Sequence, residues 1–578
     1  MRFLLTALNA KYIHSNPGLY SLRRFSGENA VHVQIAEYTI NNRTEEILAD
    51  IYRRRPDAVG FSCYIWNWDM VQELFTELPK LLPGLPIWLG GPEVSYDAEI
   101  ILEKYPMLTG IMVGEGEETF SEVLDYYVRG RENGKKLSEI AGLVLREGRT
   151  AERRPLSLTE LPFLYDGTDD FQNRIIYYES QRGCPFRCSY CLSSIDKTVR
   201  FRDINTVKKE LQYFLDHKVE QVKFVDRTFN CNHAHAMAVW KYLLEHDNGV
   251  TNFHFEIAGD ILDEEELSVL RSMRPGLVQL EIGVQSTNAR TLQEIRRVMD
   301  IGKLKAVVAA IREGNNIHQH LDLIAGLPYE DYESFGHSFD EVYAMKPDQL
   351  QLGFLKVLKG SYMQEKAPEY GLVYTEKPPY EVLYTRWLSY EDVCRLKRIE
   401  EMVEFYYNSS QFTHTMPFLE RAFQSPFAMY EALADFYEAG GYFKETPSRI
   451  YRYQVLLSFA EQYDGAHLPL YKELLTFDMY LRENAKSRPD FAGDREDIKG
   501  KLSDFYRREA EERRLLPDYE GYDGRQLARM THLEEFRYPV WQQEPGESPE
   551  TGYVLFDYKN CNPLNREARI VVLKNLQI

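Results

Sequence analysis

The sequence predicts an α/β protein with an N-terminal doubly wound, Rossmann-like domain, a central partial (β/α)6 barrel and a mostly helical C-terminal domain. Its 578 residues correspond to about three or four domains of ordinary size. Short apolar strands alternate with amphipathic helices in two separate stretches, which indicates parallel sheets. Charged, tyrosine-rich helical segments follow. We place the domain boundaries at residues 1–130, 131–170, 171–372 and 373–578, with the second range as a linker.

Composition argues against several classes of protein. Hydrophobic residues make up 44% of the chain, which is enough for large buried cores. The formal net charge of −20 argues against broad binding to nucleic acid or to an anionic membrane. No stretch approaches about 18 consecutive apolar residues and the N-terminus lacks a cleavage pattern, so we expect no membrane span. Seven cysteines do not suggest a disulfide framework in so long a chain, which favours a reducing, cytoplasmic location.

The first 130 residues alternate strand and helix signals. Buried strands are expected in five apolar runs, namely RFLLTAL, VHVQIAE, AVGFSC, PIWLGG and GIMVGE, with amphipathic runs between them. Ligands of such sheets bind at the carboxyl ends of the strands. The candidate binding residues at that edge are Ser62, Gly90, Gly91 and Gly114.

Residues 131–170 are predicted to connect the first domain to the next. RGRENGKK and REGRTAERRP are polar and charged, whereas GLVLREG between them is typical of a small hairpin strand. The proline-punctuated PLSLTELPFLYDG follows as an extended segment.

The strand–helix alternation restarts at Ile175. We expect six strands, at 175–179, 221–225, 252–257, 277–283, 318–325 and 349–355. Helical patterns lie between them, at 206–217, 234–245, 263–272, 301–313 and 332–345. Six strand–helix units in this length indicate a parallel barrel or a partial one, in which chemistry takes place at the carboxyl ends of the strands.

Beyond about residue 375 the pattern changes to charged helical stretches such as EEMVEFYYN and FAMYEALADFYEAGGYF. GYVLFDY and ARIVVL near the end are typical of strands. The many tyrosines of this region could stack on an aromatic substrate or serve amphipathic packing.

Three cysteines lie close together directly after the first strand of the barrel. Cys184, Cys188 and Cys191 are spaced C-x3-C-x2-C, and three thiolates on one loop bind a soft metal centre. Structural zinc usually takes two separated C-x2-C pairs, and no second pair exists here. An iron–sulfur cluster with three protein ligands leaves one iron open to another molecule. The spacing therefore favours a catalytic cluster over a zinc site or three unrelated buried thiols.

This segment resembles the radical S-adenosylmethionine (radical SAM) enzymes. The spacing C-x3-C-x2-C follows a strand and an Arg-Gly, and Tyr190 precedes the last cysteine. VKFVDRTFN, LEIGVQS and LIAGLPYE resemble later strand motifs of the branch that also carries a cobalamin domain. The resemblance covers roughly residues 1–360, and the part after it resembles a C-terminal extension of unknown function.

The resemblance implies that the three cysteines hold a 4Fe–4S cluster whose open iron binds S-adenosylmethionine. One electron from the cluster would cleave that molecule and give a 5′-deoxyadenosyl radical. An external donor, flavodoxin-like or ferredoxin-like, would supply the electron. The further cofactor-binding residues that the resemblance implies are Tyr190, Asp226, Glu281, Gln285, Arg297 and Gly326.

Each of these roles has a simpler alternative. Glu281 and Gln285 could line a polar interior, and Asp226 could cap the next helix. Arg297 would bind the methionine carboxylate as a bidentate partner, but its neighbour Arg296 could be the true match.

The first domain resembles the cobalamin-binding domain found in front of this barrel, through GFS, LGGPEVS and VGEGEETF. A flavodoxin-like domain or a nucleotide site has similar glycine turns. The family often carries D-x-H-x-x-G after the first strand, with the histidine on cobalt. Here NAKYIHSNPG contains His14 without the aspartate or the glycine spacing, so we expect that His14 does not ligate cobalt. Tyr64 and Trp66 could cover a face of the corrin or pack in the core.

The resemblance implies cobalamin-dependent methyl transfer to an unreactive carbon of a small-molecule or peptide substrate. Radical ring contraction or cyclisation is an alternative on the same architecture. Methylthiolation of tRNA would need a second cysteine trio in the first domain, where Cys63 stands alone. A zinc-stabilised binding protein is the non-enzyme alternative.

Overall fold

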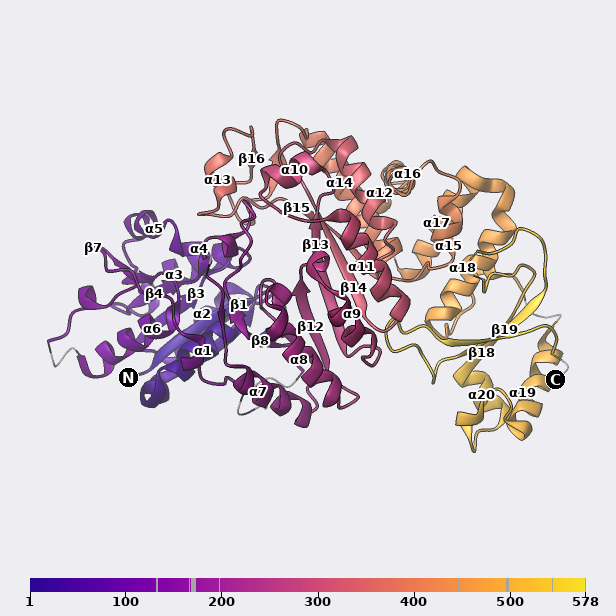
Figure 1. The fold of residues 1–578 in the computed structure, drawn as a ribbon, viewed down its shortest axis with the longest axis horizontal. Coiled ribbons are helices and arrows are strands. Elements are labelled where there is room, and N and C mark those ends of the chain that lie inside the picture. The colour runs from indigo at the N-terminus through magenta and orange to yellow at the C-terminus, as the bar shows by residue number, and fades with distance from the viewer. Residues whose placement is uncertain are drawn as a thin grey trace.

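The computed structural model describes residues 1–130, 134–165, 167, 173–196, 198–444, 448–494, 498–542 and 544–576. Figure 1 shows three lobes in a row, with the N-terminal sheet at one end, the barrel in the middle and the C-terminal helices at the other end. The predicted fold class is confirmed. The boundaries expected at residues 131 and 171 fall outside the described residues.

The N-terminal sheet has seven strands in the order β2-β1-β3-β4-β5-β6-β7, and its first five strands are parallel. Those five are β1 (Phe3–Asn9), β2 (Val33–Thr39), β3 (Ala58–Ser62), β4 (Ile87–Gly90) and β5 (Gly110–Met112). The helices are α1 (Pro17–Phe25), α2 (Thr44–Arg54), α3 (Trp68–Leu81), α4 (Pro92–Ser95), α5 (Ala98–Lys104) and α6 (Gly116–Asp125). Helices α1 and α6 pack on one face and α2, α3 and α5 on the other, so the domain is doubly wound.

The segment that we expected to be a linker adds two strands to this sheet. Strand β6 (Leu143–Leu145) pairs antiparallel with β5, and β7 (Gly148–Arg149) pairs antiparallel with β6. All three residues of β6 are buried. The predicted hairpin strand therefore belongs to the first sheet, because its apolar side chains find a core only there.

The central sheet has six parallel strands in the order β15-β14-β13-β12-β11-β8. They are β8 (Ile176–Tyr178), β11 (Gln221–Phe224), β12 (Asn252–Ile257), β13 (Val278–Gln285), β14 (His318–Ala325) and β15 (Gln349–Phe354). Their helices are α7 (Ile204–Asp216), α8 (His233–Glu245), α9 (Glu264–Arg271), α10 (Ala289–Glu294), α11 (Ile301–Gly314) and α12 (Tyr332–Tyr343). Buried and half-buried residues alternate along β13, so the helices cover an apolar face and leave a polar inner face.

The C-terminal lobe begins beside the last barrel strand. Its helices are α14 (Tyr390–Val403), α15 (Thr415–Glu420), α16 (Pro426–Ala439), α17 (Arg449–Asp464), α18 (Leu468–Arg482), α19 (Lys499–Glu512) and α20 (Gly524–Met530). An antiparallel sheet follows, of β18 (Thr531–Phe536), β19 (Gly552–Asp557) and β20 (Arg569–Leu573). Among the described helices, none combines the length and hydrophobicity needed to cross a bilayer.

The C-terminal lobe also covers the free edge of the barrel sheet. Asn408, in the short helical turn η9 (Glu404–Asn408), accepts from the backbone amide of Leu350 and donates to its carbonyl oxygen, both at 2.9 Å. These bonds satisfy backbone groups that β15 would otherwise leave open at the sheet edge.

Candidate active site

The three cysteines lie on the loop that follows β8. Two short strands, β9 (Gln181–Arg182) and β10 (Arg200–Phe201), pair antiparallel and close this loop at its base. Gly183 has φ +97°, and a Cβ there would stand 2.2 Å from the carbonyl oxygen of Thr198. Because only glycine fits this approach, Gly183 fixes the path of the chain into Cys184.

Backbone hydrogen bonds fix the middle of the cysteine loop. The amide of Ser189 donates to the carbonyl of Ile295, and the amide of Met363 donates to the carbonyl of Ser189, each at 2.9 Å. Ile295 follows α10, and Met363 belongs to α13 (Tyr362–Lys366). The loop is therefore held by the segment after β13 and by the segment after the last barrel strand.

Cys184 and Cys188 are buried and Cys191 is half-buried. Burial raises the pKa of the Cys184 thiol, and the hydrogen bond with Thr228 Oγ1, at 3.6 Å, opposes that shift. A thiol with a raised pKa ionises when a metal ion displaces its proton. The three thiols thus suit a soft metal centre.

Arg297 reaches the cysteine loop, and Gln285 lies near it beside Gly283. Arg297 Nη1 lies 3.8 Å from Cys188 Sγ, and Arg297 Nη2 donates to the Gly283 carbonyl. A Cβ on Gly283 would stand 2.3 Å from Gln285 Nε2, so Gln285 needs the glycine beside it. Gln285 Oε1 and Arg297 Nε are buried without a hydrogen-bond partner in the part of the chain that the structure describes. These orphaned atoms, one acceptor and one donor, fit a zwitterionic ligand.

The neighbouring arginine lies in a different environment. Arg296 is exposed, and its guanidinium stacks 3.6 Å from the ring centre of Tyr362. The structure therefore directs Arg297, and not Arg296, toward the cysteines.

Glu281 lies on β13, the strand that ends at Gln285, and belongs to a separate polar group. It accepts from Lys223 Nζ at 3.2 Å and lies 3.1 Å from His254 Nε2. Burial opposes its ionisation, but the bond with His254 and the charge of Lys223 outweigh this effect and lower its pKa to about 2. His320 and Asp322 form a second pair at 3.0 Å on the neighbouring strand. The structure thus places Glu281 with the polar inner face of the barrel and not with Arg297.

Asp226 has a different environment from the ligand contact that we expected. Its side chain is fully buried, and it accepts from the backbone amides of Ser180 and Gln181 at 2.9 and 3.1 Å and from Ser180 Oγ at 2.5 Å. His235 Nε2 lies 2.9 Å from the same hydroxyl. Burial, opposed by the bond from Ser180, raises the pKa of Asp226 to about 8. Asp226 therefore positions the chain that leads into the cysteine loop.

Gly326 and Tyr190 both pack against neighbouring segments of the protein. Gly326, just after β14, has φ +90°, and a Cβ there would stand 2.8 Å from Val382. Val382, of β17 (Val382–Tyr384), therefore fills the side on which a larger residue would place its side chain, and the approach of the Gly326 backbone to adenine stays a prediction. Tyr190 packs against the apolar cluster around Leu327 and Met363, with Arg297 close enough to lower its pKa against the larger effect of burial.

The predicted residues of the first domain lie at the carboxyl ends of its strands. Ser62 ends β3 and accepts from Asn16 Nδ2 at 3.2 Å. Gly91 has φ +112°, and a Cβ there would stand 2.5 Å from the carbonyl oxygen of Cys63, so two strand ends meet closely at this glycine. Gly90 ends β4, and Gly114 follows β5 with nothing within 4 Å of the position of its absent Cβ.

This edge faces the first strand of the barrel. His14 Nδ1 lies 2.5 Å from the hydroxyl of Tyr177, which belongs to β8. Burial lowers the pKa of His14, and the charges of Lys11 and Lys223 lower it further, which places His14 beside the inner face of the barrel. The carboxyl edge of the first sheet therefore lies along β8, the first strand of the barrel.

Two aromatic side chains stand at this edge. Tyr64 and Trp66 stack with ring centres 4.3 Å apart and planes at 9°. Trp66 is 45% exposed, and its Nε1 donates to the carbonyl of Leu8 at 3.0 Å. A stacked aromatic pair with an exposed ring, at the carboxyl ends of β1 and β3, fits a large planar ligand.

Ion pairs between the first domain and the barrel involve residues that the sequence analysis did not predict for the site. Glu115 and Glu117, at the start of α6, pair with arginines on both sides of the cysteine loop. Arg200 Nη2 lies 2.5 Å from Glu115, and Arg182 Nη2 lies 2.9 Å from Glu117. VGEGEE carried the acids as a visible signal, but we considered only its glycines.

Comparison with known families matches three consecutive parts of the chain. A B12 binding domain model matches residues 4–124, and a Radical SAM superfamily model matches residues 178–342. A model of a protein of unknown function, DUF4080, matches residues 368–556.

Similar curated proteins include two methyltransferases. The cobalamin-dependent radical SAM methyltransferase TokK of Streptomyces tokunonensis is 27% identical over 56% of this chain and 51% of its own length. The 2-(S-pantetheinyl)-carbapenam-3-carboxylate methyltransferase of Streptantibioticus cattleyicolor is 27% identical over 48% of this chain and 44% of its own. The chain thus spans about half the length of these relatives.

Solved structures share the fold. The cobalamin-dependent S-adenosylmethionine radical enzyme OxsB, with aqua-cobalamin bound, superposes with a TM-score of 0.56 at 14% identity, over 84% of this chain and 82% of its own. The radical SAM methyltransferase TsrM of Kitasatospora setae gives 0.54 at 17% identity, over 65% of this chain and 77% of its own.

The matched families account for the cofactors that we expected. A radical SAM domain implies a 4Fe–4S cluster and S-adenosylmethionine, and a B12-binding domain implies cobalamin. The thiols, the orphaned atoms of Gln285 and Arg297 and the aromatic pair fit these groups. The chain is therefore a radical SAM protein that carries a B12-binding domain in front of its radical SAM domain and a DUF4080 domain behind it.

Proposed function

We propose that this chain is a cobalamin-dependent radical SAM methyltransferase acting on an unreactive carbon of a small-molecule or peptide substrate. The observation that carries the proposal is the position of the cysteine loop, which lies beside Arg297 and is joined through Arg182 and Arg200 to the start of α6 in the B12-binding domain. The names of the similar curated proteins TokK and the carbapenam-carboxylate enzyme favour methyl transfer over radical cyclisation.

The residues of the cysteine loop have distinct parts in this proposal. Cys184, Cys188 and Cys191 would hold the cluster. Arg297 would bind the carboxylate of S-adenosylmethionine through its guanidinium, and Gln285 would accept from the amino group, since each has a buried atom without a partner in the described residues. When bound, the cluster would supply the electron for reductive cleavage of S-adenosylmethionine, and cobalamin would carry the methyl group.

The polar inner face of the barrel would position the substrate. Glu281 stays ionised at neutral pH because its pKa is lowered to about 2, and its bond with Lys223 fixes that side chain. His254 completes the group and would orient a polar part of the substrate near the cysteine loop. Such a group favours a substrate with hydrogen-bonding substituents over a purely hydrocarbon one.

The first domain would hold the corrin at the other side of the same space. Ser62, Gly90, Gly91 and Gly114 line the strand ends, and the Tyr64–Trp66 pair would contact a face of the ring. His14 is bonded to Tyr177, so we retain the prediction that it does not ligate cobalt. An external flavodoxin-like or ferredoxin-like protein would provide electrons.

Anaerobic turnover assays test the proposal. The chain, reconstituted with iron, sulfide and hydroxocobalamin, is given a chemical reductant and S-adenosylmethionine labelled with deuterium in the methyl group. We expect release of 5′-deoxyadenosine and S-adenosylhomocysteine, and neither product from the Cys184→Ala, Cys188→Ala or Cys191→Ala variants. Release of neither product by the fully reconstituted chain would contradict the proposal. Release of 5′-deoxyadenosine alone, with candidate substrates present, would favour radical rearrangement over methyl transfer.

A further inference from the structure

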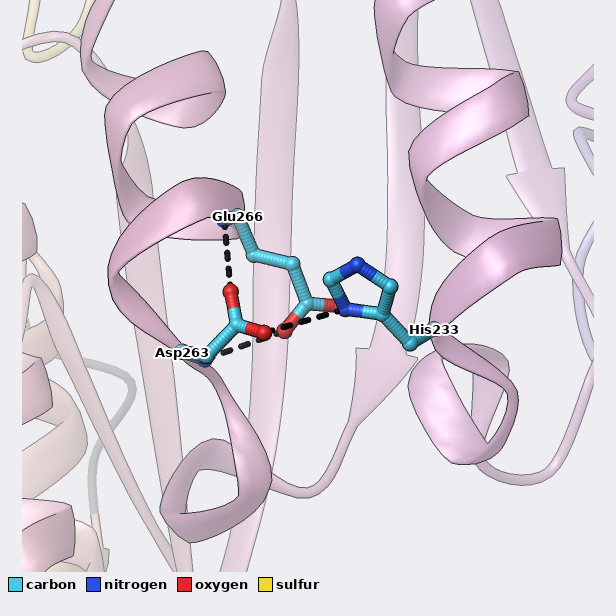
Figure 2. Close-up of side chains that lie close together, drawn as sticks. All are labelled: His233, Asp263 and Glu266. Atoms are coloured by element: carbon cyan, nitrogen blue, oxygen red, sulfur yellow. Dashed lines mark hydrogen bonds and ion pairs between the residues drawn. The ribbon is translucent and has the colours of Figure 1, made fainter.

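A histidine and two carboxylates meet at the N-termini of two neighbouring barrel helices. Figure 2 shows His233 at the start of α8 turned toward Asp263 and Glu266 at the start of α9. The two helices follow β11 and β12, so the group lies on the edge of the barrel sheet that also carries the cysteine loop. None of these residues has a part in the proposed methyl transfer.

Helix capping uses only one oxygen of each of the two carboxylates, Asp263 and Glu266. Asp263 Oδ1 accepts from the amide of Glu266 at 2.9 Å, and Glu266 Oε2 accepts from the amide of Asp263 at 3.1 Å, which forms a capping box. Asp263 Oδ2 and Glu266 Oε1 are left, and both lie toward His233. The distances to His233 Nδ1 are 3.1 Å from Asp263 Oδ2 and 3.6 Å from Glu266 Oε1.

The buried carboxylate of Glu266 is the second observation. Its side chain is 3% exposed, and Oε1 has no hydrogen-bond partner in the part of the chain that the structure describes. A buried carboxylate oxygen without a partner is costly, so its position needs an explanation other than the capping box. A cation between Glu266 Oε1 and His233 Nδ1 would satisfy it.

The spacing of the three atoms fits a small tetrahedral ion. Bonds of about 2.0–2.1 Å to nitrogen and oxygen place the ligands of a tetrahedral zinc ion about 3.3 Å apart. The two distances to His233 Nδ1, 3.1 and 3.6 Å, fall on either side of this value. All three ligand atoms lie within 4.8 Å of one another.

A fourth residue would orient the histidine. Glu265 Oε2 lies 3.7 Å from His233 Nε2, and Lys241 Nζ holds the other oxygen of Glu265 at 2.9 Å. Histidines that bind a metal through one ring nitrogen usually donate from the other to a carboxylate or carbonyl. Helix N-termini carry partial positive charge that repels cations, but the two ligand carboxylates outweigh it.

We infer that His233, Asp263 and Glu266 bind a divalent transition-metal ion, with zinc as the ion that fits the distances best. His233 and Asp263 are half exposed, which leaves a path for the ion and a fourth position for water. The ion would tie α8 to α9. The loops before these helices are already joined by two hydrogen bonds of 2.9 Å between Asn230 and Ala258, so the ion would add a second link at the active edge.

Zinc titration by calorimetry tests this inference independently of the proposed methyl transfer. The titration uses the full chain with Cys184, Cys188 and Cys191 replaced by serine, so that the cysteine loop cannot take up zinc. His233→Ala removes one ligand. The double variant Asp263→Asn with Glu266→Gln removes both carboxylates but retains capping side chains. His337→Ala is the matched control, because His337 is exposed beside a single acid, Glu333, at 4.0 Å.

We expect one saturable site in the triple serine variant and in its His337→Ala form, weakened at least tenfold by His233→Ala and by the double variant. Equal zinc affinity in all four proteins, or no saturable binding in any of them, would overturn the inference. If circular dichroism shows that the serine variant is unfolded, the same comparison is made in the cluster-loaded chain with its native cysteines.

Discussion

Arg296 and Arg297 are adjacent in the sequence, but their side chains lie in different surroundings. Arg297 is directed to Cys188 and the carbonyl of Gly283, whereas Arg296 stacks on Tyr362 at the surface. The sequence alone left both arginines as candidates, because a loop has no periodicity from which to assign a face. The tertiary contact with the cysteine loop distinguishes them.

This difference gives a matched pair of variants. Arg297→Ala removes a guanidinium that we propose binds the carboxylate of S-adenosylmethionine, and we expect cleavage of that molecule to fall at least tenfold with iron content unchanged. Arg296→Ala should leave cleavage within twofold of the original chain. The measurement is the rate of 5′-deoxyadenosine release per bound cluster. A larger loss in Arg296→Ala than in Arg297→Ala would reverse the assignment.

Asp226 makes a prediction about pH. Its pKa is raised to about 8 in the folded protein, against an ordinary value of about 3.9. The folded state therefore binds the proton more tightly, and the stability that this contributes is full below about pH 4 and is lost as pH rises through 8. Asp226→Asn mimics the neutral acid and can still accept from the amides of Ser180 and Gln181. We expect the melting temperature of the variant to rise relative to the original chain between pH 5 and pH 9. Parallel melting profiles across this range would contradict the assigned pKa.

At the scale of elements, strands with a strong apolar run were predictable from sequence. Two barrel strands, Asn252–Ile257 and His318–Ala325, match their predicted bounds, because helices cover one face of each with apolar side chains. Strand β18 was missed. Its sequence THLEEF contains two adjacent acids. Glu534 is buried because His532 and Arg488, which is distant in sequence, each pair with it at 2.8 Å.

Some parts of the candidate site could be predicted from the sequence and others could not. The cysteines could be identified from their spacing, and the glycines from their position after strands. Contacts between elements could not be predicted, such as His14 with Tyr177 or Asp226 with Ser180, because each depends on how two distant segments pack.

The link between α6 and β10 gives a prediction about coupling of elements. Glu115 and Arg200 are 23% and 18% exposed, so their ion pair is shielded enough to stabilise the hairpin that closes the cysteine loop. A cycle of Glu115→Gln, Arg200→Gln and the double variant should give a coupling energy of about 1–2 kcal/mol. Hydrogen exchange of the β9 and β10 amides measures it as local opening.

The exposed pair Arg149–Glu99 provides the control for this cycle. Its side chains are 39% and 53% exposed, and it lies within the first domain. Glu99→Gln should leave exchange at β9 and β10 unchanged, since exposed pairs contribute little. A coupling energy near zero for Glu115 and Arg200 would show that this ion pair does not hold the loop.

At the scale of the whole molecule, the B12-binding domain and the DUF4080 domain lie on opposite sides of the barrel (Figure 1). The B12-binding domain contacts the barrel through His14, Glu115 and Glu117. Glu93 of α4 also pairs at 2.9 Å with Lys359, which belongs to the segment after the last barrel strand. The DUF4080 domain covers the opposite edge of the barrel sheet through Asn408. The carboxyl edge of the first sheet therefore contacts the segments that follow the first and the last barrel strands, where two cofactors serving one reaction could meet.

The measurement that tests this account most directly is an anaerobic absorption spectrum of the chain reconstituted with iron, sulfide and hydroxocobalamin and then repurified. It is recorded for the original chain, for Cys184→Ala and for Trp66→Ala. We predict iron–sulfur charge-transfer absorption and corrin bands together in the original chain, loss of the cluster alone in Cys184→Ala, and weakened corrin retention alone in Trp66→Ala. A chain that retains no corrin, or whose cluster absorption survives Cys184→Ala, would contradict the account.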